Sequence, residues 1–144
     1  MGIADADSAE NDSGSRNIVI APVLCAVPNR AQDDPKLIGA GRLGIEPGSL
    51  LHSIYGAKET DEQYFCNYEV NPEFEVRLQT AGLRIAARGP RGEARGAEIP
   101  GRRFFLATLF QPQLSSRPDR PHPVLIAFLK ASGTAVPGSV GFQS

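Results

Sequence analysis

The sequence predicts an α/β domain, in which helices cover a β-sheet, and three observations support this class. Residues 104–110, FFLATLF, form an almost unbroken apolar, β-prone run, as expected of a central strand buried on both faces. Residues 72–82 carry an amphipathic helical pattern, and residues 83–99 read as a β-hairpin. Reacting groups in open α/β sheets lie beyond the carboxyl ends of the strands. Any chemistry is therefore expected just after residue 110.

Each predicted helix has recognisable ends. Residues 49–55 begin with Ser49 as an N-cap and are followed by Gly56, a residue that tolerates the left-handed terminating conformation. Residues 72–82 open with proline and close with glycine, which favours a helix of that length. A last helix opens at residues 122–123. Its apolar stripe is expected to be core and consists of Val124, Leu125, Phe128 and Leu129.

The remaining segments read as strands, turns and tails. Residues 17–27 have the β-branched density of a buried strand, and residues 62–71 are also strand-like. The hairpin pairs residues 83–87 with 93–99 around a glycine-rich turn. Residues 1–16 are acidic, small and turn-rich, and composition alone predicts a flexible leader.

Size, charge and cysteine content narrow the class of protein. The 144 residues suit one domain, and a net charge of −1 gives no electrostatic footprint for nucleic acid or an anionic membrane. Cys25 and Cys66, without a signal peptide or an apolar run near 18 residues, favour a cytoplasmic protein with free thiols. The glycine-rich residues 39–45 match neither a dinucleotide-binding motif nor a P-loop, and we expect no cofactor and no metal site.

Several short motifs occur in a consistent order. Residues 42–44 read Arg-Leu-Gly, residues 68–71 read Tyr-Glu-Val-Asn, and residues 81–84 read Ala-Gly-Leu-Arg. Residues 116–118 read Ser-Arg-Pro, and residues 120–123 read Arg-Pro-His-Pro. Together they resemble the C-terminal glutaminase domain of CTP synthases, which belongs to the class I glutamine amidotransferases.

This resemblance implies a three-layer flavodoxin-like glutamine amidotransferase fold, of which the chain holds only the C-terminal part together with the hairpin. Residues 4–10 resemble the segment that follows the helix after the family's nucleophilic cysteine. We therefore expect residues 1–131 to form a partial domain and residues 132–144 a disordered tail. A sheet without its first parallel strands has an open edge, so self-association of the isolated chain is expected.

The resemblance also locates the catalytic positions. In the family the last strand runs into Phe-His-Pro-Glu, which supplies two members of a Cys-His-Glu triad. Here the same place reads Phe110-Gln111-Pro112-Gln113, so Gln111 and Gln113 stand where the family has its His and Glu. A carboxamide cannot act as a general base near neutral pH, and it cannot stabilise an imidazolium by charge. A Gly-x-Cys-x-Gly nucleophile elbow is absent from these residues.

The substrate pocket is changed as well. Before the Tyr-Glu-Val-Asn motif the family carries a run of arginines and histidines that helps bind glutamine, whereas residues 63–67 here read QYFCN. The resemblance assigns the pocket to Phe65, Cys66, Asn67 and Tyr68. A bound α-carboxylate needs charge-assisted hydrogen bonds to offset its desolvation, so we expect weak glutamine binding.

The cysteines and His52 are further candidates for a functional role. Cys66 is a packing thiol in one interpretation and a reactive thiol near the cleft in the other, whereas Cys25 lies among apolar residues and is expected to be core. His52 has no acidic or cysteine partner nearby in the sequence, which favours a surface or packing role.

Three functional hypotheses remain open at this point. The first is a degenerate amidotransferase-like domain without glutaminase activity, acting in binding or regulation or surviving as a truncated product. The second is a thiol-dependent enzyme completed by a missing N-terminal part. The third is a functional part of a CTP synthase, which hydrolyses glutamine and aminates UTP to CTP with a synthetase domain as partner.

Overall fold

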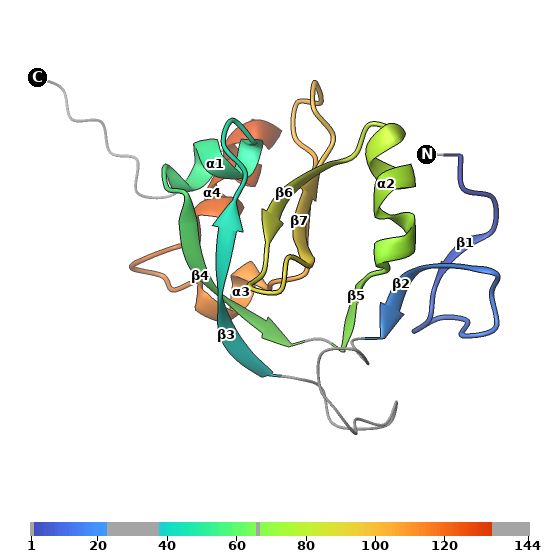
Figure 1. Ribbon diagram of the computed structural model, residues 1–144. Coiled ribbons are helices and arrows are strands. Elements are labelled where there is room, and N and C mark those ends of the chain that lie inside the picture. The colour runs from blue at the N-terminus through green and yellow to red at the C-terminus, as the bar shows by residue number, and fades with distance from the viewer. Residues whose placement is uncertain (1, 23–37, 66, 134–144) are drawn as a thin grey trace, which may run out of the picture.

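The computed structural model describes residues 2–22, 38–65 and 67–133, which form two β-sheets with helices packed beside them (Figure 1). The strands are β1 (Ala6–Ser8), β2 (Asn17–Pro22), β3 (Ile38–Ile45), β4 (Glu59–Phe65), β5 (Tyr68–Val70), β6 (Arg84–Arg88), β7 (Ala94–Glu98) and β8 (Leu106–Thr108). The helices are α1 (Leu50–Tyr55), α2 (Pro72–Thr80), α3 (Pro112–Ser115) and α4 (Pro123–Ser132). Helices and strands alternate along the chain, as expected for the predicted α/β class.

The smaller sheet has the order β1-β2-β5. Strand β1 runs parallel to β2, and β2 runs antiparallel to β5. The Asn17 side-chain amide donates to the Ala4 carbonyl (2.7 Å), and the Ala9 N–H donates to the Ile20 carbonyl (2.9 Å). The flexible leader predicted from composition is therefore wrong for residues 2–16, because they form a strand and its connection to β2. Residues 23–27 of the predicted strand lie outside the described part of the chain.

The larger sheet is antiparallel throughout and has the order β4-β3-β6-β7-β8. The predicted hairpin is confirmed as β6 and β7. Strand β3 was not anticipated, because its three glycines resemble a loop. Gly39 is needed there, since a Cβ at that position would lie 2.7 Å from the hydroxyl oxygen of Tyr64 on the paired strand β4.

The predicted central strand is an edge strand. Within the described residues β8 pairs only with β7, at the end of the sheet order, and Phe105 beside it is 41% exposed. The apolar run therefore has one covered face, whereas a central strand would have two. The strand-like stretch of residues 62–71 is divided between β4 and β5, so the chain passes there from one sheet to the other.

The helix ends follow their local sequence signals. The Ser49 hydroxyl accepts the His52 N–H (2.9 Å) at the start of α1, and Gly56 ends the helix with φ of 64°. Helix α2 begins at Pro72, behind an Asn71 N-cap. Part of the expected loop at residues 114–121 is instead the end of the short helix α3. Helices α1 and α4 lie together beside the larger sheet, whereas α2 packs near β6 (Figure 1).

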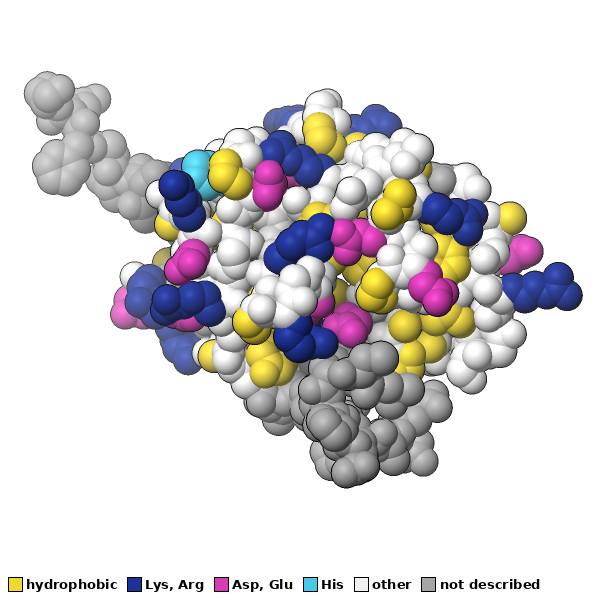
Figure 2. Space-filling model, viewed as in Figure 1, with side chains coloured by type: hydrophobic (Ala, Val, Ile, Leu, Met, Phe, Trp, Pro, Cys, Tyr) yellow, Lys and Arg dark blue, Asp and Glu magenta, His cyan; other side chains and the backbone are white. Residues whose placement is uncertain are grey.

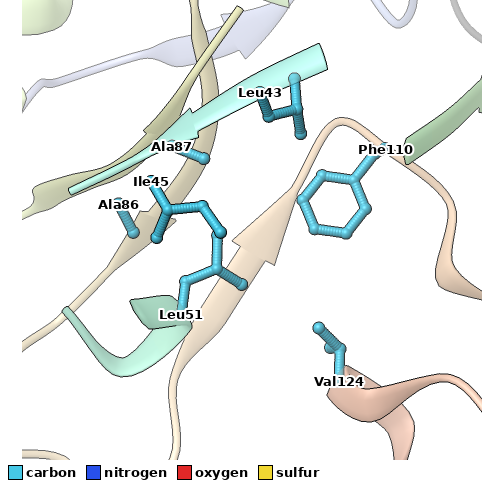
Figure 3. Packing of buried hydrophobic residues seen from close by; sticks show 7 residues of the cluster. All are labelled: Leu43, Ile45, Leu51, Ala86, Ala87, Phe110 and Val124. Atoms are coloured by element: carbon cyan, nitrogen blue, oxygen red, sulfur yellow. The ribbon is translucent and has the colours of Figure 1, made fainter. Parts of the chain in front are cut away.

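The main core lies between the larger sheet and helices α1 and α4, with Leu51 completely buried (Figure 3). Phe110 brings the end of the β8 segment into this core. The cluster consists of Leu43, Ile45, Leu51, Ala86, Ala87, Phe110 and Val124. The expected core stripe of α4 is only partly correct, because Val124 is buried but Phe128 is 54% exposed and packs edge-on against Phe104.

Candidate functional site

The larger sheet curls so that the chain leaving β8 meets the far end of β4. The Gln111 N–H donates to the Gln63 carbonyl (2.8 Å), and the Gln111 side-chain amide donates to the Phe65 carbonyl (3.3 Å). The position that the resemblance assigns to the family's catalytic His thus lies against the strand predicted to form the substrate pocket. Both assignments came from separate motifs, and the structure brings them together.

The other predicted site residues are exposed or half-buried. Gln113 lies in α3 and is exposed, and Phe65, at the end of β4, is 40% exposed. Asn67 and Tyr68 are half-buried, and Tyr68 begins β5. Cys66, the candidate reactive thiol, and Cys25 lie outside the described residues, so their roles stay predictions.

An arginine next to the predicted pocket residues is paired with a carboxylate. The guanidinium carbon of Arg95 lies 5.9 Å from the Tyr64 ring centroid, and Arg95 also donates to Glu93 at 3.1 and 3.2 Å. Burial alone would raise the pKa of Glu93, but hydrogen bonds from the backbone and from Arg95 outweigh it and lower that pKa. Arg95 is therefore held by Glu93 and does not replace the cations missing from residues 63–67.

Beside Gln63 on the same strand, Glu62 belongs to a polar cluster with His122 and the half-buried Tyr55, which we call the buried triad. Glu62 and His122 are only 4% and 5% exposed. The Glu62 carboxylate accepts from the Tyr55 hydroxyl, and His122 Nε2 lies 3.0 and 3.1 Å from its two oxygens. The triad joins the end of α1, the middle of β4 and the start of α4.

Hydrogen bonding identifies the tautomer of His122 and perturbs Tyr55. His122 Nδ1 accepts the Val124 N–H (3.2 Å) at the N-terminus of α4, so Nε2 carries the proton and donates to Glu62. Burial first, and then the hydrogen bond and charge of Glu62, raise the pKa of Tyr55 far above its ordinary value. The three groups satisfy one another, which makes the triad a structural element.

Sequence reasoning missed this triad because its members are far apart in the chain. Glu62 and His122 are 60 positions apart, and Tyr55 and His122 are 67 apart. The only local signal was the Arg-Pro-His-Pro motif, in which His122 precedes a helix-starting proline and takes the N-cap position. His52 is half-buried on α1.

The surface shows no concentration of one charge in the view of Figure 2, where Lys and Arg side chains lie interspersed with Asp and Glu. Among residues 2–22, 38–65 and 67–133, no three His, Cys, Asp or Glu side chains gather in a metal-binding arrangement. In the same residues, no helix combines the length and apolar character needed to cross a bilayer.

Known proteins resemble this chain in sequence and in fold. A solved structure of the Trypanosoma brucei CTPS glutaminase domain with bound acivicin superposes with a TM-score of 0.81 at 29% identity, over 94% of this chain and 53% of that one. CTP synthase of Methanocaldococcus jannaschii is 36% identical over 91% of the chain, and that of Archaeoglobus fulgidus is 34% identical over 92%. No protein-family model matches the chain.

The fold defines a glutaminase-type domain of the class I glutamine amidotransferases, with the predicted flavodoxin-like α/β fold. More narrowly, the chain belongs to the CTP synthase family and corresponds to the C-terminal glutaminase part. It spans about a quarter of the length of these relatives, 24% of the first and 25% of the second.

Proposed function

We propose that this chain is a catalytically silent glutaminase-type domain with a binding or regulatory role. The observation that carries the proposal is the pair of carboxamides at Gln111 and Gln113, where the family has its His and Glu. In family chemistry an imidazole takes the thiol proton and returns it to the leaving ammonia. A carboxamide has no basic lone pair for that step, and the Gln111 amide already donates to the Phe65 carbonyl.

The residues near the proposed substrate pocket also support a catalytically silent domain. Residues 63–67 contain no lysine or arginine, and Arg95 beside Tyr64 is held by Glu93. A glutamine α-carboxylate at this edge would lose its hydration without gaining a charge-assisted partner from these residues. Weak or absent glutamine binding is therefore part of the proposal.

Two measurements test the proposal. The purified chain is incubated with glutamine, released ammonia is assayed, and glutamine binding is followed by saturation-transfer NMR. We expect ammonia at the level of the enzyme-free blank and no binding signal at millimolar glutamine. Turnover above the blank contradicts the silent assignment, and loss of that turnover in Cys66→Ser would assign the chemistry to Cys66.

A second candidate is a functional part of a glutamine-hydrolysing CTP synthase, or of a thiol-dependent enzyme, that another part completes. The short span of the match favours it, because a chain covering a quarter of its relatives lacks most of their length. The partner would then be an N-terminal part or a synthetase domain. Reading the gene upstream for an in-frame Gly-x-Cys-x-Gly elbow decides between the candidates. In both, we propose that the protein acts in the cytoplasm.

A further inference from the structure

The Arg-Leu-Gly motif of residues 42–44 ends where β3 meets β6, and a pocket opens there. The two strands pair at two positions only, Gly44 with Arg88 and Ile45 with Ala87. Between them lies a hollow of about 300 Å³, which we call the Gly44 pocket. Small-molecule sites in proteins begin at about this volume. The Gly44 pocket can therefore hold a ligand of a few heavy atoms.

The fold does not require a glycine at position 44. Its backbone has no positive φ, and a Cβ there would meet nothing closer than the Arg88 carbonyl oxygen, 4.0 Å away. Gly39 on the same strand differs, because a Cβ there would collide with Tyr64. Strand positions otherwise favour β-branched side chains. The glycine at position 44 therefore keeps the pocket open and serves no need of the backbone.

Two exposed side chains of opposite charge line the pocket, Glu46 and Lys58. Their backbones lie on neighbouring segments, because the Ile45 N–H donates to the Lys58 carbonyl (2.7 Å). Among the residues that the structure describes, neither charged group makes a side-chain hydrogen bond or an ion pair. The hydrogen bond to Glu75, and less strongly the charge of Glu46, raise the pKa of Arg88 against the effect of burial. The Glu46 carboxylate thus acts across the pocket.

The other two charged residues of the pocket already have partners. Arg88 donates to the Glu75 carboxylate (3.3 Å). Glu59 lies 3.6 Å from the Arg42 guanidinium. The charges left for a ligand are therefore one positive and one negative.

The rest of the lining is apolar. Ile45, Ile85 and Ala87 are 4%, 7% and 1% exposed and contribute to the pocket. Methyl groups placed against them would be removed from water at a gain in free energy. An amide placed there would lose its hydration without a hydrogen-bond partner.

We infer that the Gly44 pocket binds a zwitterionic α-amino acid with an aliphatic side chain, such as leucine. The ligand carboxylate pairs with Lys58, its ammonium pairs with Glu46, and its side chain lies on the apolar lining. Lys58 directly precedes β4, whereas Gln111 contacts the other end of that strand. The inference therefore concerns a second site and holds whether or not the proposed silence at Gln111 is correct.

Saturation-transfer NMR with the full chain tests the inference. L-Leucine should give methyl signals with half-saturation at about 1 mM, because exposed ion pairs contribute modestly to affinity. N-acetyl-leucine lacks the ammonium and leucinamide lacks the carboxylate, so each should bind at least about tenfold more weakly. Glutamine should also bind at least about tenfold more weakly, because its carboxamide would lie on the apolar lining.

Variants locate the binding. Gly44→Val fills the pocket and keeps both charges, so it should abolish the leucine signal. Lys58→Gln and Glu46→Gln each remove one charge and should weaken binding about tenfold. Lys130→Gln and Glu73→Gln make the same changes at exposed positions of α4 and α2, and as matched controls they should leave binding unchanged. Circular dichroism verifies that each variant is folded.

Leucine binding that survives Gly44→Val, or no leucine binding by the folded unaltered chain, overturns the inference. Equal binding of N-acetyl-leucine or of leucinamide also overturns it, because the pocket would then hold an anion through Lys58 or a cation through Glu46. Equal binding of glutamine contradicts the selectivity of the apolar lining and overturns the aliphatic assignment. Ammonia release does not enter this assay. A chain that releases ammonia and still binds leucine in this pocket would refute the proposed function and leave the present inference standing.

Discussion

Two neighbouring residues of β4 belong to regions of opposite character. The Glu62 side chain is buried and bound to Tyr55 and His122, whereas Gln63 is exposed at the edge where Gln111 meets Phe65. The molecule thus keeps a His–Glu pair inside, where solvent and glutamine cannot reach it. At Gln111 and Gln113, the positions that the resemblance assigns to the family's His and Glu, it carries amides. The difference teaches that the titratable groups of this region lie where they hold the fold together, whereas the positions proposed to correspond to the family's proton-handling groups carry amides.

The largest expected effect comes from breaking the interior pair. In His122→Ala the Glu62 carboxylate stays buried without its imidazole partner, and His122 no longer caps α4. We expect the lost hydrogen bond to a charged group and the lost cap to lower the free energy of unfolding by about 2 to 4 kcal/mol, measured by urea titration. Gln113→Ala, at an exposed position of α3, is the control and should change stability by less than about 0.5 kcal/mol. Equal stability losses in the two variants would remove the distinction between the regions.

The pH dependence of stability probes the same triad through Tyr55. Its folded-state pKa lies above the value of 10.0 that holds in the unfolded chain, so the folded state keeps a proton that the unfolded state releases at high pH. This contribution to stability is present below pH 10.0 and falls as the pH rises further, by up to about 1.4 kcal/mol per pH unit.

The measurement is urea unfolding at several pH values between about 9 and 11, a range set by the ordinary tyrosine pKa. Tyr55→Phe should remove this part of the slope, whereas Tyr64→Phe, beside Arg95 and outside the triad, should retain it. An unchanged slope in Tyr55→Phe would show that the phenol does not hold its proton through Glu62.

Much of the fold follows from local signals. The Ser49 cap, the Gly56 terminator and the proline at the start of α2 act within a few residues of chain, so the sequence alone placed those helices. The hairpin of β6 and β7 is local for the same reason. The edge position of β8 was not predictable, because an apolar run indicates that two faces are to be buried without indicating what covers them.

Some residues of the candidate site could be predicted from sequence motifs and others only from the structure. Motif resemblance assigned Gln111 and Phe65 to a catalytic position and a substrate pocket, and a hydrogen bond joins the two residues, although these roles stay predictions. The buried triad escaped notice because Glu62 and His122 meet only through the packing of α4 against the curled sheet. A glutamate within a polar strand and a histidine before a proline are common local patterns, and neither predicts that the two side chains meet.

The smallest expected effect comes from restoring the family's residues at the surface. Gln111→His combined with Gln113→Glu supplies an imidazole and a carboxylate at positions that are half-buried and exposed, so stability should change by less than about 0.5 kcal/mol. Ammonia release from glutamine should stay at the blank, because residues 63–67 still hold no cation and Arg95 remains paired with Glu93. Adding Phe65→Arg places a guanidinium at the pocket edge, and glutamine binding by NMR should appear in that triple variant before any turnover does. Hydrolysis by the double variant alone would contradict this expectation. It would show that the chain still binds glutamine and that only the acid–base groups at positions 111 and 113 were needed for turnover.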